Sequence, residues 1–169
     1  LLVKADLLGK IGKFEEALEI YPIVAEKHPT QPRAFMDYGH TLKTTGRYED
    51  AIIAYRNAIT LPDETAEAYW NLSNMKTFRF TDHDINNMEA MDCTCPNDAA
   101  YICFALGKAY EDRKQYKDSF DAYELGNEIR DSQDGHDIRK NLMNTARQMN
   151  TFREGFIAKE RGHPSHEPI

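Results

Sequence analysis

The chain has 169 residues, of which 41% are hydrophobic and 29% are charged, and its formal net charge is −7. These values are ordinary for one water-soluble domain. The negative charge speaks against nonspecific binding to nucleic acid, and it mildly favours a positively charged partner. No apolar run approaches the roughly 18–20 residues of a membrane helix, so we expect no membrane partner. The 3 cysteines are too few for a disulfide scaffold, which predicts a reducing, cytoplasmic compartment.

Apolar residues recur at intervals of three and four along most of the chain, which is the spacing of amphipathic helices. Residues 1–11 and 14–28 form the first predicted pair of helices, with Gly12 at the turn between them. The second pair begins at Pro32, a residue that suits the first turn of a helix, and it turns at Gly46. The first half of the chain therefore predicts two consecutive helical hairpins.

The third predicted pair is irregular. Its first helix covers residues 64–78, and Phe80 then stands where the earlier pairs hold a turn glycine. Thr81 or Asp82 caps a short second helix that ends near residue 91.

A fourth pair begins near Asp98, and a polar stretch after Asp131 leads into one long helix over residues 136–160. Gly162 and Pro164 end that helix. Its single apolar stripe would cover the last exposed face of the array, which arrays of helical hairpins need for solubility.

A period of 34 residues relates the pairs. Gly39 and Gly107 stand two periods apart with Ser73 between them, and Tyr21 and Tyr55 stand one period apart. This period, with small and aromatic residues at fixed offsets, resembles the tetratricopeptide (TPR) helix-turn-helix repeat. The resemblance implies an all-α fold, a TPR superhelix (α-α solenoid) of about four repeats plus a long C-terminal capping helix. We place the repeats over 1–131 (1–30, truncated, then 31–64, 65–97 and 98–131), a capping or linker helix over 132–161, and a linker toward a missing downstream domain over 162–169.

The resemblance also implies where a partner would bind, because TPR proteins line a concave surface with their first helices. Met36, Trp70, Tyr101 and Phe104 are apolar at positions that the helical phase turns away from the repeat core. With polar groups around them they would form a groove for a protein or a peptide. The alternative is that the chain's own last helix or a missing domain covers them. The positions carried over are Arg33, Met36, Asp37, His40 and Lys43 from the second repeat, Glu67, Trp70, Asn71, Asn74 and Phe78 from the third, and Tyr101, Phe104 and Lys108 from the fourth.

One known use of TPR grooves does not fit these positions. TPR proteins that clamp a terminal carboxylate use two asparagines and several lysines or arginines from adjacent repeats. Asn71 and Asn74 would suit such a clamp, but Met36, Tyr101 and Ala105 stand where the cations are expected. The sequence therefore speaks against a carboxylate clamp in the groove.

Residues that could carry chemistry form no recognisable catalytic, cofactor or metal site. None of the 6 histidines stands at a familiar spacing from an acid and a nucleophile. Cys93 and Cys95 form a C-x-C pair, whereas zinc sites use a wider cysteine spacing. The run from Leu8 to Lys13 contains two glycines but lacks the strand that precedes a phosphate-binding loop. We therefore expect no catalytic residue, no metal and no cofactor in this part of the protein.

Two short sequence motifs in the last repeat resemble a more specific family. Residues Phe104–Asp112 and Gly126–Arg130, together with the irregular third repeat, look like the bacterial family in which TPR repeats precede a sulfotransferase domain. The resemblance covers roughly Glu67 to Ile169. Within it, Phe152 to Ile169 resembles that family's approach to its catalytic domain, where a proline-apolar pair such as Pro168-Ile169 opens the first strand. It implies that the loop binding the 5′-phosphate of 3′-phosphoadenylyl sulfate, the catalytic base and the donor pocket all lie downstream. No catalytic residue of the family falls on this sequence.

Three hypotheses follow from these patterns. The leading one is a protein-protein interaction scaffold, the TPR region of a larger sulfotransferase, whose partner is a protein, a peptide or the parent's own sulfotransferase domain. The first alternative is a structural part of an enzyme that transfers a sulfuryl group from 3′-phosphoadenylyl sulfate. The second is a free-standing TPR adaptor. Since the chain starts inside a repeat and without Met, we also expect a segment upstream.

Overall fold

The computed structural model describes residues 1–61, 65–134, 143 and 147. This described part contains eight α-helices and no β-strand, so the prediction of an all-α fold is confirmed. Residues Leu1–Gln133 form one compact unit. The capping helix expected over 132–161 and the linker expected over 162–169 lie, apart from residues 132–134, 143 and 147, outside the described residues.

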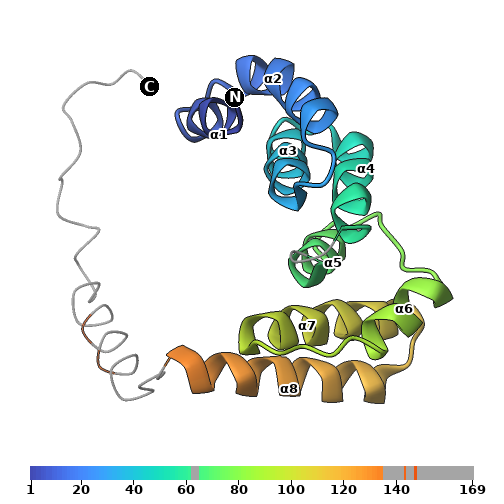
Figure 1. Ribbon diagram of the computed structural model, residues 1–169. Coiled ribbons are helices and arrows are strands. Elements are labelled where there is room, and N and C mark those ends of the chain that lie inside the picture. Colours follow the sequence, from blue (N-terminus) through green and yellow to red (C-terminus); the bar gives the residue numbers. More distant parts are fainter. Residues whose placement is uncertain (62–64, 135–142, 144–146, 148–169) are drawn as a thin grey trace, which may run out of the picture. The chain divides into compact units, whose positions relative to one another are not determined.

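Helices α1–α2 and α3–α4 form packed hairpins, while α5 and α6 both pack against α7 (Figure 1). The contacts join α1 to α2, α2 to α3, α3 to α4, α4 to α5, and α5 to α7. This succession of neighbour contacts is the packing of an α-solenoid. The helices are α1 (Leu2–Lys10), α2 (Phe14–Lys27), α3 (Pro32–Thr44), α4 (Tyr48–Ile59), α5 (Thr65–Ser73), α6 (Asp82–Glu89), α7 (Pro96–Asp112) and α8 (Tyr116–Asp134).

Close approach of the helices within a hairpin depends on glycine. A Cβ atom built on Gly39 of α3 would lie 2.5 Å from Cε1 of Tyr55 on α4. Two repeat periods later, a Cβ atom on Gly107 of α7 would lie 2.8 Å from Cδ1 of Tyr123 on α8. Such contacts are too short for any real side chain, so the period of small and aromatic residues marks the points where paired helices touch. Ser119 of α8 adds a hydrogen bond, because its Oγ donates to the Gly107 carbonyl at 2.8 Å.

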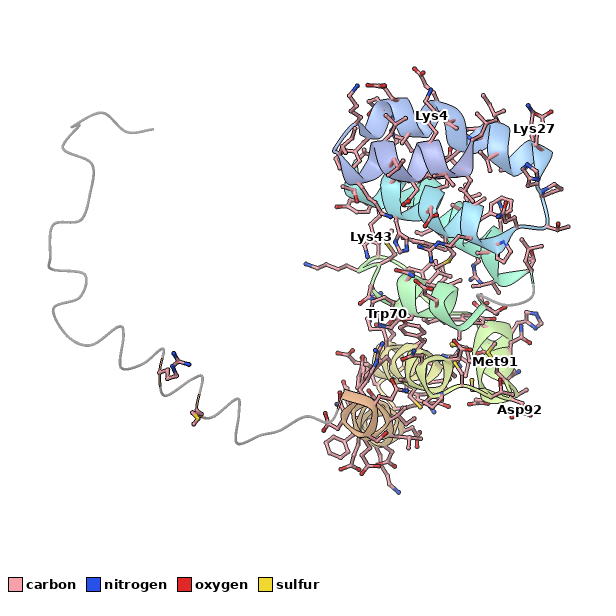
Figure 2. All side chains as sticks on the ribbon, turned by 60° about the vertical axis from the view of Figure 1, so that its left-hand side comes forward. Lys4, Lys27, Lys43, Trp70, Met91 and Asp92 are labelled. Atoms are coloured by element: carbon pink, nitrogen blue, oxygen red, sulfur yellow. The ribbon has the colours of Figure 1, made fainter. Side chains whose placement is uncertain are left out.

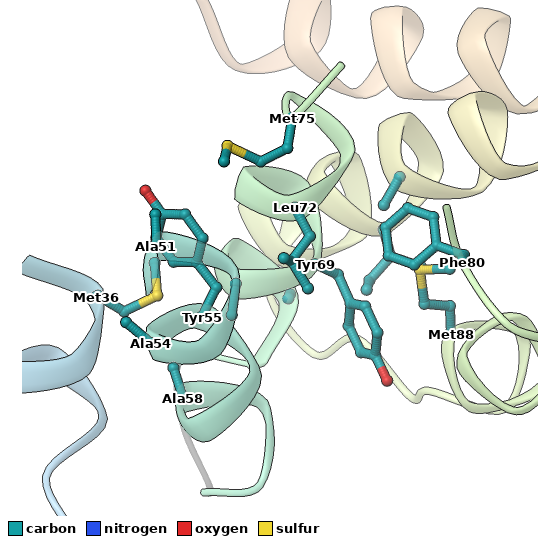
Figure 3. Packing of buried hydrophobic residues seen from close by; sticks show 14 of the residues in the cluster. Met36, Ala51, Ala54, Tyr55, Ala58, Tyr69, Leu72, Met75, Phe80 and Met88 are labelled. Atoms are coloured by element: carbon teal, nitrogen blue, oxygen red, sulfur yellow. The ribbon is translucent and has the colours of Figure 1, made fainter. Parts of the chain in front are cut away.

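The main hydrophobic cluster extends from Leu18 of α2 to Ala109 of α7. Figure 3 shows its central part, with Tyr55 of α4, Tyr69 and Leu72 of α5, and Met88 of α6. Each of these side chains is at most 1% exposed. Burial of a large apolar side chain stabilises a fold by about 1.5–3 kcal/mol, so this cluster holds the second, third and fourth hairpins together.

The third hairpin departs from the repeat earlier than the sequence predicts. The expected helix over 64–78 ends at Ser73, so its predicted C-terminal boundary is wrong. Ser73 Oγ and Asn74 Nδ2 both donate to the Trp70 carbonyl, at 2.7 and 2.9 Å, beside the Asn74 backbone N–H at 3.2 Å. Side chains that bond to a nearby carbonyl in this way compete with continuation of the helix.

The short second helix of this hairpin begins where the sequence predicts. Thr81 caps α6 with a reciprocal capping box, in which its Oγ1 accepts from the Asp84 N–H and Asp84 Oδ2 accepts from the Thr81 N–H at 2.8 Å. The box satisfies two backbone donors at the start of the helix. The irregular repeat therefore has a well-defined start for α6 after an early end of α5.

Candidate functional site

An aromatic cavity lies between α5, α7 and α8. It has a volume of about 330 Å³ and is lined by Trp70, Ser73, Asn74, Phe104, Lys108 and Tyr123. Trp70, labelled in Figure 2, is partly exposed, and its ring lies 5.1 Å from the ring of Tyr101 between centroids. The structure thus brings together five of the residues predicted to line a groove: Trp70, Asn74, Tyr101, Phe104 and Lys108.

The side chains of this aromatic cavity are positioned by close helix packing. Phe104 lies against Gly126 of α8, where an added Cβ atom would come within 2.8 Å of the Phe104 ring. Tyr123 passes over Gly107 and reaches the cavity from α8. The guanidinium of Arg130 lies 5.1 Å from the centroid of the Tyr101 ring, a cation–π distance. The aromatic walls are therefore held by backbone approach from α7 and α8.

The polar edge of the aromatic cavity includes an ion-pair network. The Lys108 ammonium forms an ion pair with Asp112 one helical turn later. Asp112 Oδ2 is buried without a hydrogen bond and forms an ion pair with the Arg79 guanidinium at 3.5 Å. Lys108 is thus partly neutralised from inside the fold, and it orders the edge of the cavity rather than leaving a free charge there.

A second cavity, the turn cavity, opens beside the aromatic cavity. Its volume is about 420 Å³, and it is lined by Lys43, Tyr48, Asn74, Met75, Lys76 and Thr77. Asn74 lines both cavities, which makes them neighbours on the surface. The turn cavity exists because α5 ends at Ser73 and the chain after it runs past the turn between α3 and α4.

A third cavity, the N-terminal cavity, lies between α1, α2 and α3 and has a volume of about 260 Å³. The predicted residues Arg33, Asp37 and His40 meet there. Arg33 Nε lies 3.0 Å from Asp37 Oδ1, and Lys10 Nζ lies 2.7 Å from Asp6 Oδ2. The carboxylates of this cavity are therefore matched by cations of the chain itself.

Burial shifts the pKa of two residues that line the N-terminal cavity, Asp37 and His40. It raises the pKa of the Asp37 carboxyl, against the lowering effect of Arg33. It also lowers the pKa of His40, while the charges of Glu67 and Asp37 act in the opposite direction. His40 Nδ1 lies 3.1 Å from the hydroxyl of Tyr55. The neutral imidazole is thus the form that this site favours.

Two predicted groove residues are placed wrongly by the sequence. Met36 was expected to face away from the core, but it is 0% exposed and belongs to the main hydrophobic cluster, together with Ala51, Ala54 and Ala58 of α4 (Figure 3). Small residues on α4 leave room for its side chain. Phe78 was expected on a first helix, but α5 ends before it, and Phe78 packs at 5.0 Å against the ring of Phe80.

Two further predicted residues lie beside the cavities rather than in them. Asn71 is 3% exposed, and its side-chain amide donates to the Glu67 carbonyl at 3.0 Å. Glu67 is partly exposed on α5 but lines none of the three cavities. The three cavities therefore use only part of the predicted set, and the groove itself stays a prediction.

Several cavity residues were missed from the sequence. Tyr123 follows the 34-residue phase of the core tyrosines, and nothing in that phase reveals that it also reaches the surface. Lys76 and Thr77 were expected within a helix and lie instead in the loop after it. The adjacent residues Ser73 and Asn74 could have predicted this loop, because both side chains readily donate hydrogen bonds to a preceding backbone carbonyl and so end a helix.

The cysteines serve structure in the described part of the chain. Cys95 caps α7, since its Sγ accepts from the Asp98 N–H at 3.4 Å, and Cys93 packs against the main cluster. Burial raises the thiol pKa of both Cys93 and Cys103. Across residues 1–61 and 65–134, no three His, Cys, Asp or Glu side chains lie together as a metal site would require.

Comparison with known proteins supports the repeat. Residues 32–65, which contain α3 and α4, match the family model described as Tetratricopeptide repeat. Over 173 aligned positions the chain is 24% identical to an uncharacterized protein of Aquifex aeolicus (strain VF5). That alignment covers 99% of this chain and 22% of the Aquifex protein, so the chain spans about a fifth of its relative's length.

The helix packing and this match together show an all-α, TPR-like α-solenoid. They support a role as a protein-protein interaction scaffold, because TPR repeats act by presenting a surface to protein partners. In the part of the chain that the structure describes, every helix is too short or too polar to cross a membrane.

Proposed function

We propose that this region is a protein-interaction scaffold that receives an apolar side chain of its partner in the aromatic cavity. One observation carries the proposal: Trp70 is partly exposed, stacks on Tyr101 and forms the wall of a cavity of about 330 Å³. Aromatic side chains in partly buried pockets with a polar rim are the residues that contribute most to binding energy at protein interfaces.

The composition of the rim also supports a peptide or protein partner. Ser73, Asn74 and Lys108 surround the aromatic walls and can fix the orientation of a bound backbone. The walls come from α5, α7 and α8, so the cavity is formed by packed helices. A preformed cavity loses little conformational entropy on binding, which favours affinity.

The test uses the substitution Trp70→Ala. Peptides selected from a random display library on the purified chain should bind the Trp70→Ala variant at least about tenfold more weakly, as expected for loss of a central aromatic residue. Tyr116→Ala is the matched control, because Tyr116 is an aromatic residue exposed to 66% and outside the three cavities. Equal affinity for the wild type and the Trp70→Ala variant would contradict the proposal, provided that both have the same helical circular dichroism.

We further propose that the parent protein is a sulfotransferase, to which this region contributes recognition of its substrate or partner. The support is the resemblance of residues Phe104–Asp112 and Gly126–Arg130 to the TPR region of that family. The Aquifex relative is several times longer than this chain and has room for further domains. The coding sequence after Ile169 tests this: a phosphate-binding loop is expected there, and its absence would favour a free-standing TPR adaptor.

We place this interaction in the cytoplasm, because Cys93, Cys95 and Cys103 are all free thiols and a reducing compartment keeps thiols in this state. Cell fractionation with an antibody against the chain tests the placement. Recovery from an oxidising compartment would contradict it.

A further inference from the structure

We infer that the aromatic cavity and the turn cavity form one recognition site for a peptide segment in which an apolar side chain stands beside a carboxylate. The inference rests on the proposed function, since it assigns a partner chemistry to the same surface. Asn74 joins the two cavities by lining both. A segment that places its apolar side chain against Trp70 thus has the turn cavity next to it.

Two unpaired cations line the turn cavity. Lys43 comes from the last turn of α3 and Lys76 from the loop after α5. Among the described residues neither ammonium has a carboxylate partner, whereas Lys10, Lys13 and Lys108 each have one. Two lysines around one cavity without a matching anion form a site for a negative group.

The floor of the turn cavity is apolar. Met75 is 3% exposed and belongs to the main hydrophobic cluster, and the ring of Tyr48 forms part of the wall. Thr77 adds one hydroxyl group. An apolar floor below two ammonium groups excludes part of the water around a bound anion, which strengthens its attraction to the lysines.

The charge balance favours an acidic peptide over a nucleic acid. The chain carries a net charge of −7, and this repels a polyanion over many phosphates. A single carboxylate is affected mainly by charges within a Debye length of about 8–10 Å, where Lys43 and Lys76 lie. The net charge alone mildly favours a basic partner. At the turn cavity, however, Lys43 and Lys76 favour an acidic one.

The experiment compares acidic peptides with their amide counterparts. Binders from a random peptide display library should combine an aromatic or aliphatic residue with Asp or Glu. The best binder and its Asp→Asn or Glu→Gln version are then titrated against the chain, with the fluorescence of Trp70, the chain's 1 tryptophan, as the readout. We expect the acidic peptide to bind about five- to tenfold more tightly at low salt.

The matched variants are Lys43→Gln/Lys76→Gln and Lys4→Gln/Lys27→Gln. Lys4 and Lys27 are exposed lysines outside the three cavities, and Figure 2 labels them as well as Lys43. The first variant should lose the preference for the acidic peptide, and the second should keep it. High salt should reduce the preference of the wild type, because exposed charge pairs are screened.

The outcomes separate the two proposals. If acidic and amide peptides bind equally and both change Trp70 fluorescence, the inference is wrong and the proposed function stands. If peptides bind without changing that fluorescence, or if the library returns no binder, both are wrong. Tighter binding of a single-stranded RNA oligonucleotide than of any acidic peptide overturns the inference in favour of a nucleic-acid site.

Discussion

The guanidinium of Arg56 on α4 forms a bidentate ion pair with the carboxylate of Asp84 on α6, in which Nη2 lies 2.8 Å from Oδ2. The same guanidinium lies 4.9 Å above the ring of Phe78. The same carboxylate closes the capping box with Thr81. This pair therefore joins the regular second hairpin to the loop and the short helix of the irregular third one.

Removing the charge of Asp84 should destabilise the fold. The side chain is 5% exposed, so Asp84→Asn leaves a partly buried guanidinium without its counter-ion. Breaking one side of such a pair costs about 3–5 kcal/mol in fully buried cases, and we expect about 2–4 kcal/mol here because Arg56 is partly exposed. Urea unfolding followed by circular dichroism measures the loss.

Asp82→Asn is the control for this prediction. Asp82 lies two residues away at the start of the same helix and pairs with Arg113 at 2.5 Å, but its side chain is 86% exposed. Exposed ion pairs contribute about 0–1 kcal/mol, so this variant should remain close to the wild type. Equal losses in the two variants would show that the Arg56–Asp84 pair has no special role.

The same pair predicts a dependence of stability on pH. Burial on its own would raise the pKa of Asp84, but hydrogen bonds from Arg56 and Thr81 outweigh it and lower the pKa to about 2 from 3.8. The stabilisation is therefore complete above pH 3.8 and is lost as the pH falls toward about 2. The loss amounts to about 2 kcal/mol. Unfolding measured across this range should show the slope in the wild type, and Asp84→Asn should reduce it.

Glycine at the contact between α3 and α4 gives a third prediction. Gly39→Ala places a methyl group 2.5 Å from the fully buried ring of Tyr55, so the helices must move apart or the ring must shift. We expect a loss of about 1–3 kcal/mol in the free energy of unfolding. Thermal unfolding followed by circular dichroism gives the value.

Gly9→Ala provides the matched comparison within another first helix. Its nearest contact would be Thr41 Oγ1 at 3.7 Å, an ordinary van der Waals distance. Alanine is favoured over glycine inside a helix by about 0.5–1 kcal/mol, so this variant should be slightly more stable than the wild type. A stable Gly39→Ala variant would mean that Tyr55 has room to move.

The 34-residue period predicted the contacts that repeat regularly. Gly39 with Tyr55 and Gly107 with Tyr123 could be found from the sequence, because small and aromatic residues recur there at a fixed offset. Met36 and Phe104 occupy the same place in their repeats, yet Met36 is fully buried and Phe104 reaches a cavity. The exposure of each side chain depends on the neighbouring helices that pack on its repeat. The 34-residue pattern gives the position within a repeat, but it does not identify those neighbours.

The two neighbouring cavities could be predicted only in part. The period indicated Trp70 and Phe104, which lie on the helices α5 and α7. The turn cavity depends on the end of α5, where hydrogen bonds of Ser73 and Asn74 to the Trp70 carbonyl prevail over the apolar spacing that continues beyond it. Apolar periodicity gives the face of a helix, but local polar bonds decided where this helix stops.

The first hairpin has a small hydrophobic cluster of its own, formed by Ala5, Leu8, Ala17 and Tyr21. Tyr38 of α3 packs against both this cluster and the main one, and its ring lies 5.5 Å from that of Tyr21. Leu18 of α2 belongs to the main cluster, so the first hairpin is attached to that cluster through α2 as well as through Tyr38. A solenoid whose buried residues form two clusters can melt in more than one step. Circular dichroism follows all of the helices, whereas Trp70 emission follows the packing of α5 on α7, where the Trp70 ring stacks on Tyr101. The two probes should therefore give separate transitions, with amide exchange fastest in α1 and α2.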